Sequence, residues 1–302
     1  MAAHPEWYEG LNRSSAFEEF QQRVFWSNGS LCPEPCAPAP RSGGELFCFA
    51  VARMDDSDGA DSSSADSEEG LLRAQLGRGA GIFACDDHAV LSDVDKVLGD
   101  LAAGPVRTVR IPSTKPDGIT KDGTAQNTQI FLQAWETIRK DSRYLSFDWT
   151  VKVDPDAVLV PSRLRGLLAP GALPENPFPP PYEADSGSGW WVTNCDMEGM
   201  LTEWGNGWPM MYGAAEVLSR EATRVWLAGV EECKTTIDWT NVGEDAFIGL
   251  CLRQLRVGEL FLKMGDKRCG GATCSDADKF VFHDFKSPDD WLACWDQTQE
   301  QR

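Results

Sequence analysis

Two aspartates, Asp154 and Asp156, interrupt an otherwise apolar stretch at 147–160, FDWTVKVDPDAVLV. The β-branched and aromatic residues before them predict a strand buried on both faces, and a second apolar run follows directly. Carboxylates between buried runs are costly unless a cation compensates them. Pro155 fixes its own φ and favours an extended Asp154, so both acids can converge at the carboxyl end of the strand. The pattern indicates an Asp-x-Asp metal site for a diphosphate-bearing substrate; the alternative is an ordinary Asp-Pro-Asp surface turn.

The elements that must position this pair alternate between strands and helices over the first 160 residues. The clearest helix is predicted for 124–140, where apolar residues recur on one face. Further strands are expected at 45–52, 81–91, 107–111, 189–194 and 279–285. Further helices are expected at 71–76, 94–101, 162–168, 220–228 and from 243 onward. The order predicts an α/β fold, a Rossmann-type three-layer α/β/α sandwich with a mostly parallel central sheet.

The chain divides into an amino-terminal arm and one large domain. Residues 1–44 are rich in Pro and Gly and predict an irregular arm and linker. The domain is expected to span 45–295, followed by a short tail at 296–302. Within it, 54–70 is acidic and Ser-rich with almost no apolar side chains, which predicts a mobile loop.

Charge limits the partners. The chain has 302 residues, is 42% hydrophobic and 25% charged, and is therefore of ordinary globular composition. Its formal charge is 28 − 47 = −19, so its surface should repel nucleic acid and anionic membrane. A nucleotide, itself negative, is a poor ligand for such a surface unless a bound cation supplies positive charge. The acidic balance therefore agrees with a metal site.

Ten cysteines suggest an oxidising compartment. Their spacings are not typical of zinc sites, and disulfides are the favoured interpretation, with buried free thiols as the alternative for Cys48 and Cys85. Sequons at Asn12 and Asn28 favour the secretory pathway or the Golgi lumen. No signal peptide or membrane segment is visible in the sequence, so a cytoplasmic location is the alternative.

Four separated blocks together resemble one enzyme group. They are WTVKVDPDAVLV, WPMMYGAAEVLSREA, GEDAFIGLCLRQL and VFHDF, in this order between about 125 and 285. The set is similar to the Fringe and β-1,3-galactosyltransferase group (family 31-like) of GT-A fold glycosyltransferases. Asp-Pro-Asp departs from the group's usual run of three acids, and the amino-terminal third matches only in its strand pattern. The resemblance implies a GT-A-like domain and a Mn²⁺-dependent inverting transfer, β-1,3-linked, from a UDP-sugar to a glycan or glycoprotein hydroxyl.

The resemblance also implies roles for single residues. Asp156 is the first expected metal ligand, Asp154 binds directly or through water or the ribose, and His283 is the third ligand. An imidazole with carboxylates suits Mn²⁺ better than Mg²⁺ or Ca²⁺. Asp245 matches the group's general base, and Glu244 is expected to orient it or to bind the acceptor. Acids at a helix start are also ordinary dipole partners, which is the alternative for this pair.

Three further features have two interpretations each. Gly213 and Ala214, with the following Ala, would allow the backbone to approach the donor or the acceptor closely, or would only permit tight helix–sheet packing. Lys152 is expected to be a solvated strand residue rather than a phosphate contact. Four tryptophans before this segment would stack on sugars or belong to the core; they are Trp190, Trp191, Trp204 and Trp208.

Three other functions are compatible with the same residues. A catalytically degenerate member of the fold would bind nucleotide without transfer. A metal-dependent phosphohydrolase would use the same carboxylates on water and would need no sugar acceptor. A structural secreted domain would bind no metal at Asp154 and Asp156.

Overall fold

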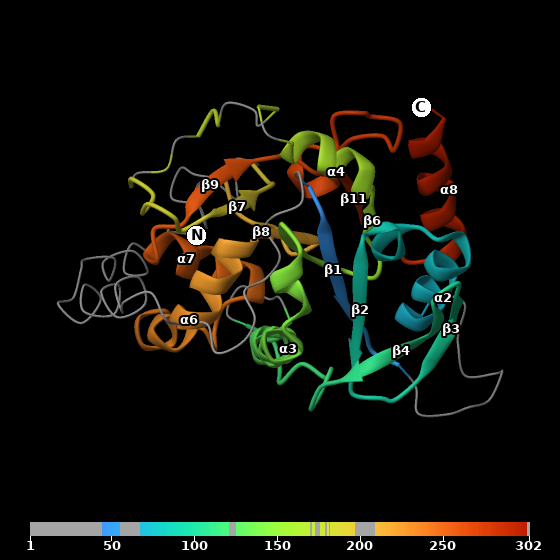
Figure 1. Ribbon diagram of the computed structural model, residues 1–302, viewed down its shortest axis with the longest axis horizontal. Helices are drawn as coiled ribbons and strands as arrows, with labels where there is room; N and C mark the ends of the chain where they lie inside the picture. The colour runs from blue at the N-terminus through green and yellow to red at the C-terminus, as the bar shows by residue number, and fades with distance from the viewer. Residues whose placement is uncertain are drawn as a thin grey trace.

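The structure is a computed structural model that describes residues 44–54, 67–120, 125–169, 171–172, 176–178, 180, 182–196 and 209–300. Its centre is an eight-stranded sheet with the order β3-β4-β2-β1-β5-β8-β7-β9 (Figure 1). These strands are β1 (Leu46–Val51), β2 (Asp87–Ser92), β3 (Val97–Leu101), β4 (Gly104–Arg110), β5 (Trp149–Val153), β7 (Trp190–Thr193), β8 (Ala215–Ser219) and β9 (Gly258–Phe261). A smaller sheet has the order β10-β11-β6 and consists of β10 (Gly265–Asp266), β11 (Val281–His283) and β6 (Val158–Leu159).

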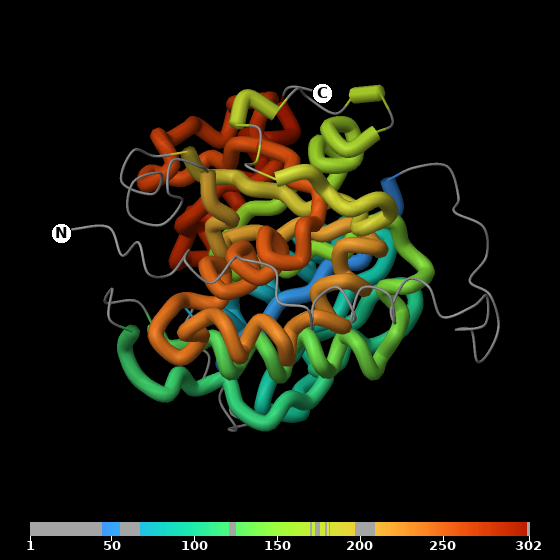
Figure 2. The backbone as a smooth tube through the Cα atoms, turned by 90° about the vertical axis from the view of Figure 1, so that its left-hand side faces the viewer, coloured from blue at the N-terminus to red at the C-terminus, as the bar shows by residue number. Residues whose placement is uncertain are grey.

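Helices cover both faces of the large sheet. One face carries α3 (Thr128–Asp141), α6 (Arg220–Thr236) and α7 (Glu244–Gln254), and Figure 2 shows α3 and α6 side by side. The other face carries α2 (Glu68–Arg78) and α4 (Pro161–Leu168), and α8 (Pro288–Gln299) packs beside α2 (Figure 1). Strand β1 contributes alternately to the two layers: Leu46, Cys48 and Ala50 face α2, whereas Phe47 and Phe49 face α3. This alternation follows from the two-residue period of a strand.

The predicted three-layer α/β/α class with a mostly parallel sheet is confirmed. Strands β4, β2, β1 and β5 are parallel neighbours, and β7 and β9 run in the same direction because β8 reverses between β5 and β7. Six of the eight strands therefore share one direction, and β3 and β8 oppose them. The carboxyl ends of β1 and β5 lie at the same edge, where the Asp-x-Asp pair follows β5.

Two local predictions are wrong. The helix expected at 94–101 is a strand, β3, paired with β4 in an antiparallel hairpin, because its backbone groups find partners in β4 rather than along a helix. The strand expected at 81–91 begins only at Asp87, since 81–84 forms a 3₁₀ turn that starts at Gly81 with φ +58°. The acids Asp86 and Asp87 consequently lie at the start of the strand, at the sheet edge opposite to the Asp-x-Asp pair.

Predicted domain limits fall partly outside the described residues. The arm at 1–43 and residues 55–66 of the acidic loop are not described, whereas 68–70 already belong to α2. At the other end, α8 continues to Gln299, so most of the predicted tail is helical.

Four disulfides join described cysteines. They are Cys48–Cys85, Cys195–Cys269, Cys233–Cys251 and Cys274–Cys294. The alternative of free thiols at Cys48 and Cys85 is wrong, because the turn at 81–84 brings Cys85 beside β1. Disulfides persist in oxidising compartments such as the secretory pathway, which agrees with the predicted environment. Among the described residues, no helix is long and apolar enough to cross a membrane.

Candidate metal and catalytic site

Asp154, Asp156 and His283 come together although 127 residues separate the second from the third. The two aspartates follow β5, and β6, directly after them, pairs with β11, which ends at His283. One ligand atom from each of the three side chains lies within 4.8 Å of the other two. The backbone is fixed locally, because Asp154 N–H donates to the Ala214 carbonyl and Ala157 N–H donates to the Asp154 carbonyl. The three residues predicted as metal ligands therefore form one cluster.

Asp266 contacts the His283 ring at Nδ1. Strands β10 and β11 are parallel and place the two residues side by side, with His283 Nδ1 2.7 Å from Asp266 Oδ2. The other ring nitrogen, Nε2, is left 3.5 Å from Asp156 Oδ2. A carboxylate on one imidazole nitrogen is the usual way to orient the other nitrogen toward a metal. Asp266 is not among the site residues predicted from the sequence, where its only signal is one acid after the largely apolar stretch at 257–264.

Neighbouring charges shift the pKa values of His283 and Asp156 in opposite directions. Burial by itself would lower the pKa of His283, but hydrogen bonds to Asp156 and Asp266 outweigh it and raise that pKa to about 9. Burial would raise the pKa of Asp156, yet His283 and the Lys286 ammonium lower it to about 2. Lys286 Nζ contacts Asp156 Oδ2 from a largely exposed position. Two carboxylates and an imidazole form a donor set that fits a divalent cation such as Mn²⁺.

We expect Asp266→Asn to weaken Mn²⁺ binding by about 10- to 100-fold, the range found for outer-shell partners of metal ligands. The amide cannot accept a charge-assisted bond from the imidazole, so the ring loses its orientation and part of its basicity. The free Mn²⁺ signal in electron paramagnetic resonance gives the dissociation constant. The control is Glu259→Gln. Glu259 is a buried acid on β9 that is paired with Arg253, and the Mn²⁺ affinity of this variant should stay within about 2-fold of wild type. Equal affinities of Asp266→Asn and wild type would contradict a metal-directed His283.

Lys152 is fully buried, so the prediction of a solvated lysine is wrong. The strand period turns Lys152 toward the face that α3 and α7 cover, and its ammonium lies 4.2 Å from the centre of the Phe131 ring. Lys152 Nζ is 2.8 Å from Asp154 Oδ1 and 3.0 Å from Glu244 Oε1. The lysine is thus the physical link between the Asp-x-Asp pair and the start of α7.

Glu244 and Asp245 begin α7, as predicted. Asp245 accepts hydrogen bonds from the backbone N–H of Gly213 at 3.0 Å and of Ala246 at 2.7 Å. Burial, together with the neighbouring Glu244 carboxylate, outweighs these bonds and raises the pKa of Asp245 to about 7. A carboxylate with this pKa is suited to accept a proton near neutral pH.

The small residues at 213–215 allow the backbone to lie close to the start of α7. A Cβ atom at Gly213 would lie 2.9 Å from Glu244 Oε1 and 3.4 Å from Asp245 Oδ2, so a larger residue does not fit. Ala214 and the following alanine are buried in the core. These contacts agree with the interpretation of tight helix–sheet packing, and contact of Gly213 and Ala214 with a donor or an acceptor stays a prediction.

A pocket of about 660 Å³ opens in front of the metal cluster. This size lies within the usual range for small-molecule sites. It is bounded by the end of β1, the starts of α2 and α3 and the metal cluster; its polar lining includes Arg53, Ser67, Glu68, Thr114, Asn127, Asp154, Asp156, His283 and Lys286. Neither Glu244 nor Asp245 lines it, and Glu244 is paired with the buried Lys152. The pocket therefore joins the three predicted ligands but not the predicted base.

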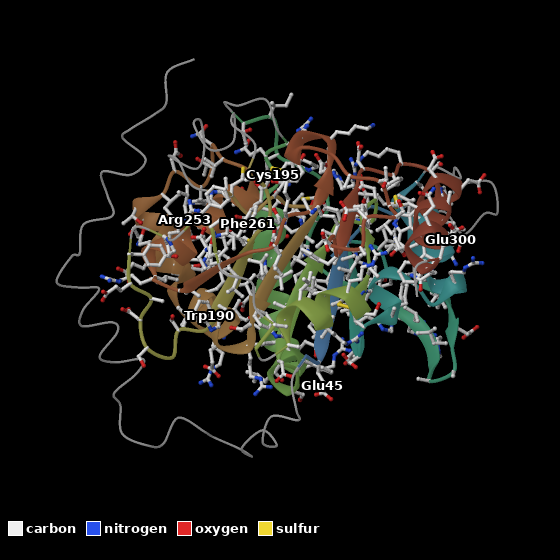
Figure 3. The ribbon with its side chains drawn as sticks, turned by 90° about the horizontal axis from the view of Figure 1, so that it is seen from above. Glu45, Trp190, Cys195, Arg253, Phe261 and Glu300 are labelled. Carbon is white, nitrogen blue, oxygen red and sulfur yellow. A yellow bond between two sulfur atoms is a disulfide. The ribbon has the colours of Figure 1, made fainter. Side chains whose placement is uncertain are left out.

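The two tryptophans of this set that the structure describes, Trp190 and Trp191, lie away from this site. Trp191 is buried in the core, and Trp190 is 44% exposed at the start of β7. Figure 3 shows Trp190 on the same side of the molecule as Glu45, which precedes β1, whereas Cys195 beyond β7 lies on the other side. The cluster of Asp154, Asp156 and His283 lies at the carboxyl ends of the strands, so Trp190 does not contact it, and for Trp191 the core interpretation holds. Trp204 and Trp208 lie outside the described residues.

No protein-family model and no curated protein matches the chain. Two similar solved structures are both of LgtC. An active-site mutant has a TM-score of 0.38 and 15% identity, covering 72% of each chain. The galactosyltransferase LgtC with donor and acceptor sugar analogues has a TM-score of 0.36 and 13% identity, covering 71% of this chain and 72% of that one. Likeness at this level does not assign a family, and membership of the Fringe and β-1,3-galactosyltransferase group stays a prediction.

Proposed function

We propose that the protein is a Mn²⁺-dependent inverting glycosyltransferase that moves a sugar from a UDP-sugar to a hydroxyl of a glycan or glycoprotein, in a β-1,3 linkage. The observation that carries the proposal is the cluster of Asp154, Asp156 and His283 at one end of a pocket of about 660 Å³. The resemblance of the four sequence blocks supports the same assignment.

The three ligands would hold the cation at the pocket end where the diphosphate of the donor is expected. A bound divalent cation would offset the negative charge that grows on a nucleoside diphosphate as its bond to the sugar breaks. Lys286 adds a second positive charge, because its ammonium is largely exposed beside Asp156. Lys286 and the cation held by the three ligands would together reduce the repulsion between a negative donor and a chain with a net charge of −19.

Asp245 would accept the proton of the acceptor hydroxyl. Inversion requires one base on the side of the sugar opposite to the leaving group. The raised pKa of Asp245 favours proton acceptance. Glu244 would stabilise this arrangement through its bond to Lys152.

Calorimetric titration of UDP, with and without Mn²⁺, tests the proposal. We expect Mn²⁺ to tighten UDP binding by at least about 10-fold, because a cation held by the three ligands would offset the charge of the diphosphate. UMP, which lacks the second phosphate, should gain much less from Mn²⁺. If UDP binds under neither condition, the proposal is wrong.

Product analysis separates transfer from hydrolysis. With a UDP-sugar and Mn²⁺, release of UDP should depend on an added glycan or glycoprotein acceptor. Release at the same rate without acceptor would favour the phosphohydrolase. Tight Mn²⁺-dependent UDP binding without any release over a broad panel of sugars and acceptors would favour the degenerate member of the fold.

The transfer rate should fall at low pH. Since Asp245 must be deprotonated to act as a base and its pKa is raised to about 7, the rate at saturating Mn²⁺ should rise about tenfold per pH unit below 7 and level off above it. Saturating Mn²⁺ is needed because protonation of His283 also opposes metal binding. Initial rates between pH 5.5 and 8 measure this profile, and a flat profile would remove Asp245 as the base.

A further inference from the structure

The Lys152 ammonium has three close oxygen partners inside the protein. It donates hydrogen bonds to the carbonyl oxygen of Gly213 at 2.7 Å and to Glu244 Oε1 at 3.0 Å. It also forms an ion pair with Asp154 Oδ1 at 2.8 Å. One cation is therefore shared between a predicted metal ligand and the helix that carries the predicted base.

A simpler role for Lys152 would be to neutralise Glu216, which lies directly opposite it in the β5–β8 pair. The geometry does not favour this role. Glu216 Oε1 is 3.6 Å from Nζ, and neither carboxyl oxygen has a hydrogen-bond partner among the described residues. Burial raises the pKa of Glu216, which lessens the charge that Lys152 would have to neutralise. The lysine is directed at Asp154 and Glu244 instead.

The backbone of Gly213 extends the link to Asp245. Its carbonyl accepts from Lys152, and its N–H donates to Asp245 Oδ2 at 3.0 Å. The contacts form a continuous series from Asp154 through Lys152 and Gly213 to Asp245. The space beside Gly213 is already filled by the two acids of α7, so the series has little room to change its geometry.

We propose that Lys152 is a positioning residue that couples cation binding at Asp154 to the acids at the start of α7. The proposal rests on the proposed function. A cation at Asp154 competes with the ammonium for the same carboxylate, and Glu244 then takes a larger share of the ammonium. Glu244 thus assists metal binding from a distance by accepting Lys152.

A double-mutant cycle with Mn²⁺ affinity as its readout tests this coupling without any measurement of activity. The four proteins are wild type, Glu244→Gln, Lys152→Met and the double variant. In the presence of Lys152, Glu244→Gln should weaken Mn²⁺ binding by about 10-fold, within the usual range of coupling between sites. In the Lys152→Met background the same change should have an effect of about 2-fold or less, because only the direct loss of a negative charge is left.

Two further variants keep the test decisive. Lys152→Arg retains the charge, which protects the fold if Lys152→Met does not fold, but its planar fork cannot match three converging acceptors. We expect Glu244→Gln to have an effect of about 2-fold in the Arg background as well. Glu216→Gln is the matched control and should leave the full 10-fold effect of Glu244→Gln in place.

The outcomes separate the two proposals. Equal effects of Glu244→Gln with and without Lys152 would overturn the coupling, and so would a full effect in the Arg background, since charge alone would then suffice. Loss of the effect in Glu216→Gln would also overturn it, because the partner of Lys152 would be Glu216. If wild type binds no Mn²⁺, the proposed function itself fails.

Discussion

Asp245→Asn is expected to abolish sugar transfer, although the variant should still bind Mn²⁺ and UDP. General-base catalysis contributes about 100- to 10,000-fold to a rate, and the amide cannot accept the proton of the acceptor hydroxyl. Asparagine has almost the same shape, and its oxygen can still accept from the backbone N–H of Gly213 or Ala246. The measurements are the transfer rate at saturating donor and the UDP dissociation constant in the presence of Mn²⁺.

The control for this variant is Asp289→Asn. Asp289 is the second residue of α8, as Asp245 is the second residue of α7, so both substitutions remove the same charge from the same helix position. Loss of the helix-start charge at the exposed Asp289 costs roughly 0.3–1 kcal/mol of stability. If the two variants transfer sugar at the same rate, Asp245 is only a helix-dipole partner, which is the alternative that the sequence leaves open.

The metal cluster could be predicted from the sequence because strand ends converge. An apolar run that stops at Asp154 and Asp156, and another that stops at His283, place all three residues where strands end, and the resemblance supplied the pairing between them. The role of Asp266 could not be predicted from the sequence, because it depends on a neighbour that is distant along the chain. Only the alignment of β10 with β11 brings Asp266 against His283 Nδ1. A single acid after an apolar run carries no sign of such a partner.

Lys152 shows a different limit. The strand period assigns Lys152 to one face of β5, but it does not say what covers that face. Helices α3 and α7 cover it, and α7 is about 90 residues further along the chain, so the sequence pattern around Lys152 does not show that this lysine is fully buried. The four disulfides are comparable, because their pairing depends on which strands and turns become neighbours. In the hairpin of β3 and β4, likewise, tertiary pairing overrides a local pattern that favoured a helix.

Asp156→Ala should reduce Mn²⁺ affinity on the order of 1,000-fold, more than the 10- to 100-fold expected for the outer-shell residue Asp266. Its pKa of about 2 means that Asp156 is ionised at every working pH, so it is the permanent negative charge of the cluster. Its removal also frees Lys286, whose positive charge then opposes a cation. Mn²⁺-dependent binding of UDP should be lost together with the metal.

The control is Asp100→Ala, which removes an exposed aspartate from β3 at the far edge of the sheet. It should bind Mn²⁺ like wild type, and both variants should keep their disulfides and circular dichroism spectra. Wild-type Mn²⁺ affinity in Asp156→Ala would place any metal elsewhere and return Asp-Pro-Asp to an ordinary turn. Loss of Mn²⁺ binding with UDP affinity unchanged would instead separate the cation from the donor pocket, because a cation that bridges the diphosphate must make the two ligands bind together.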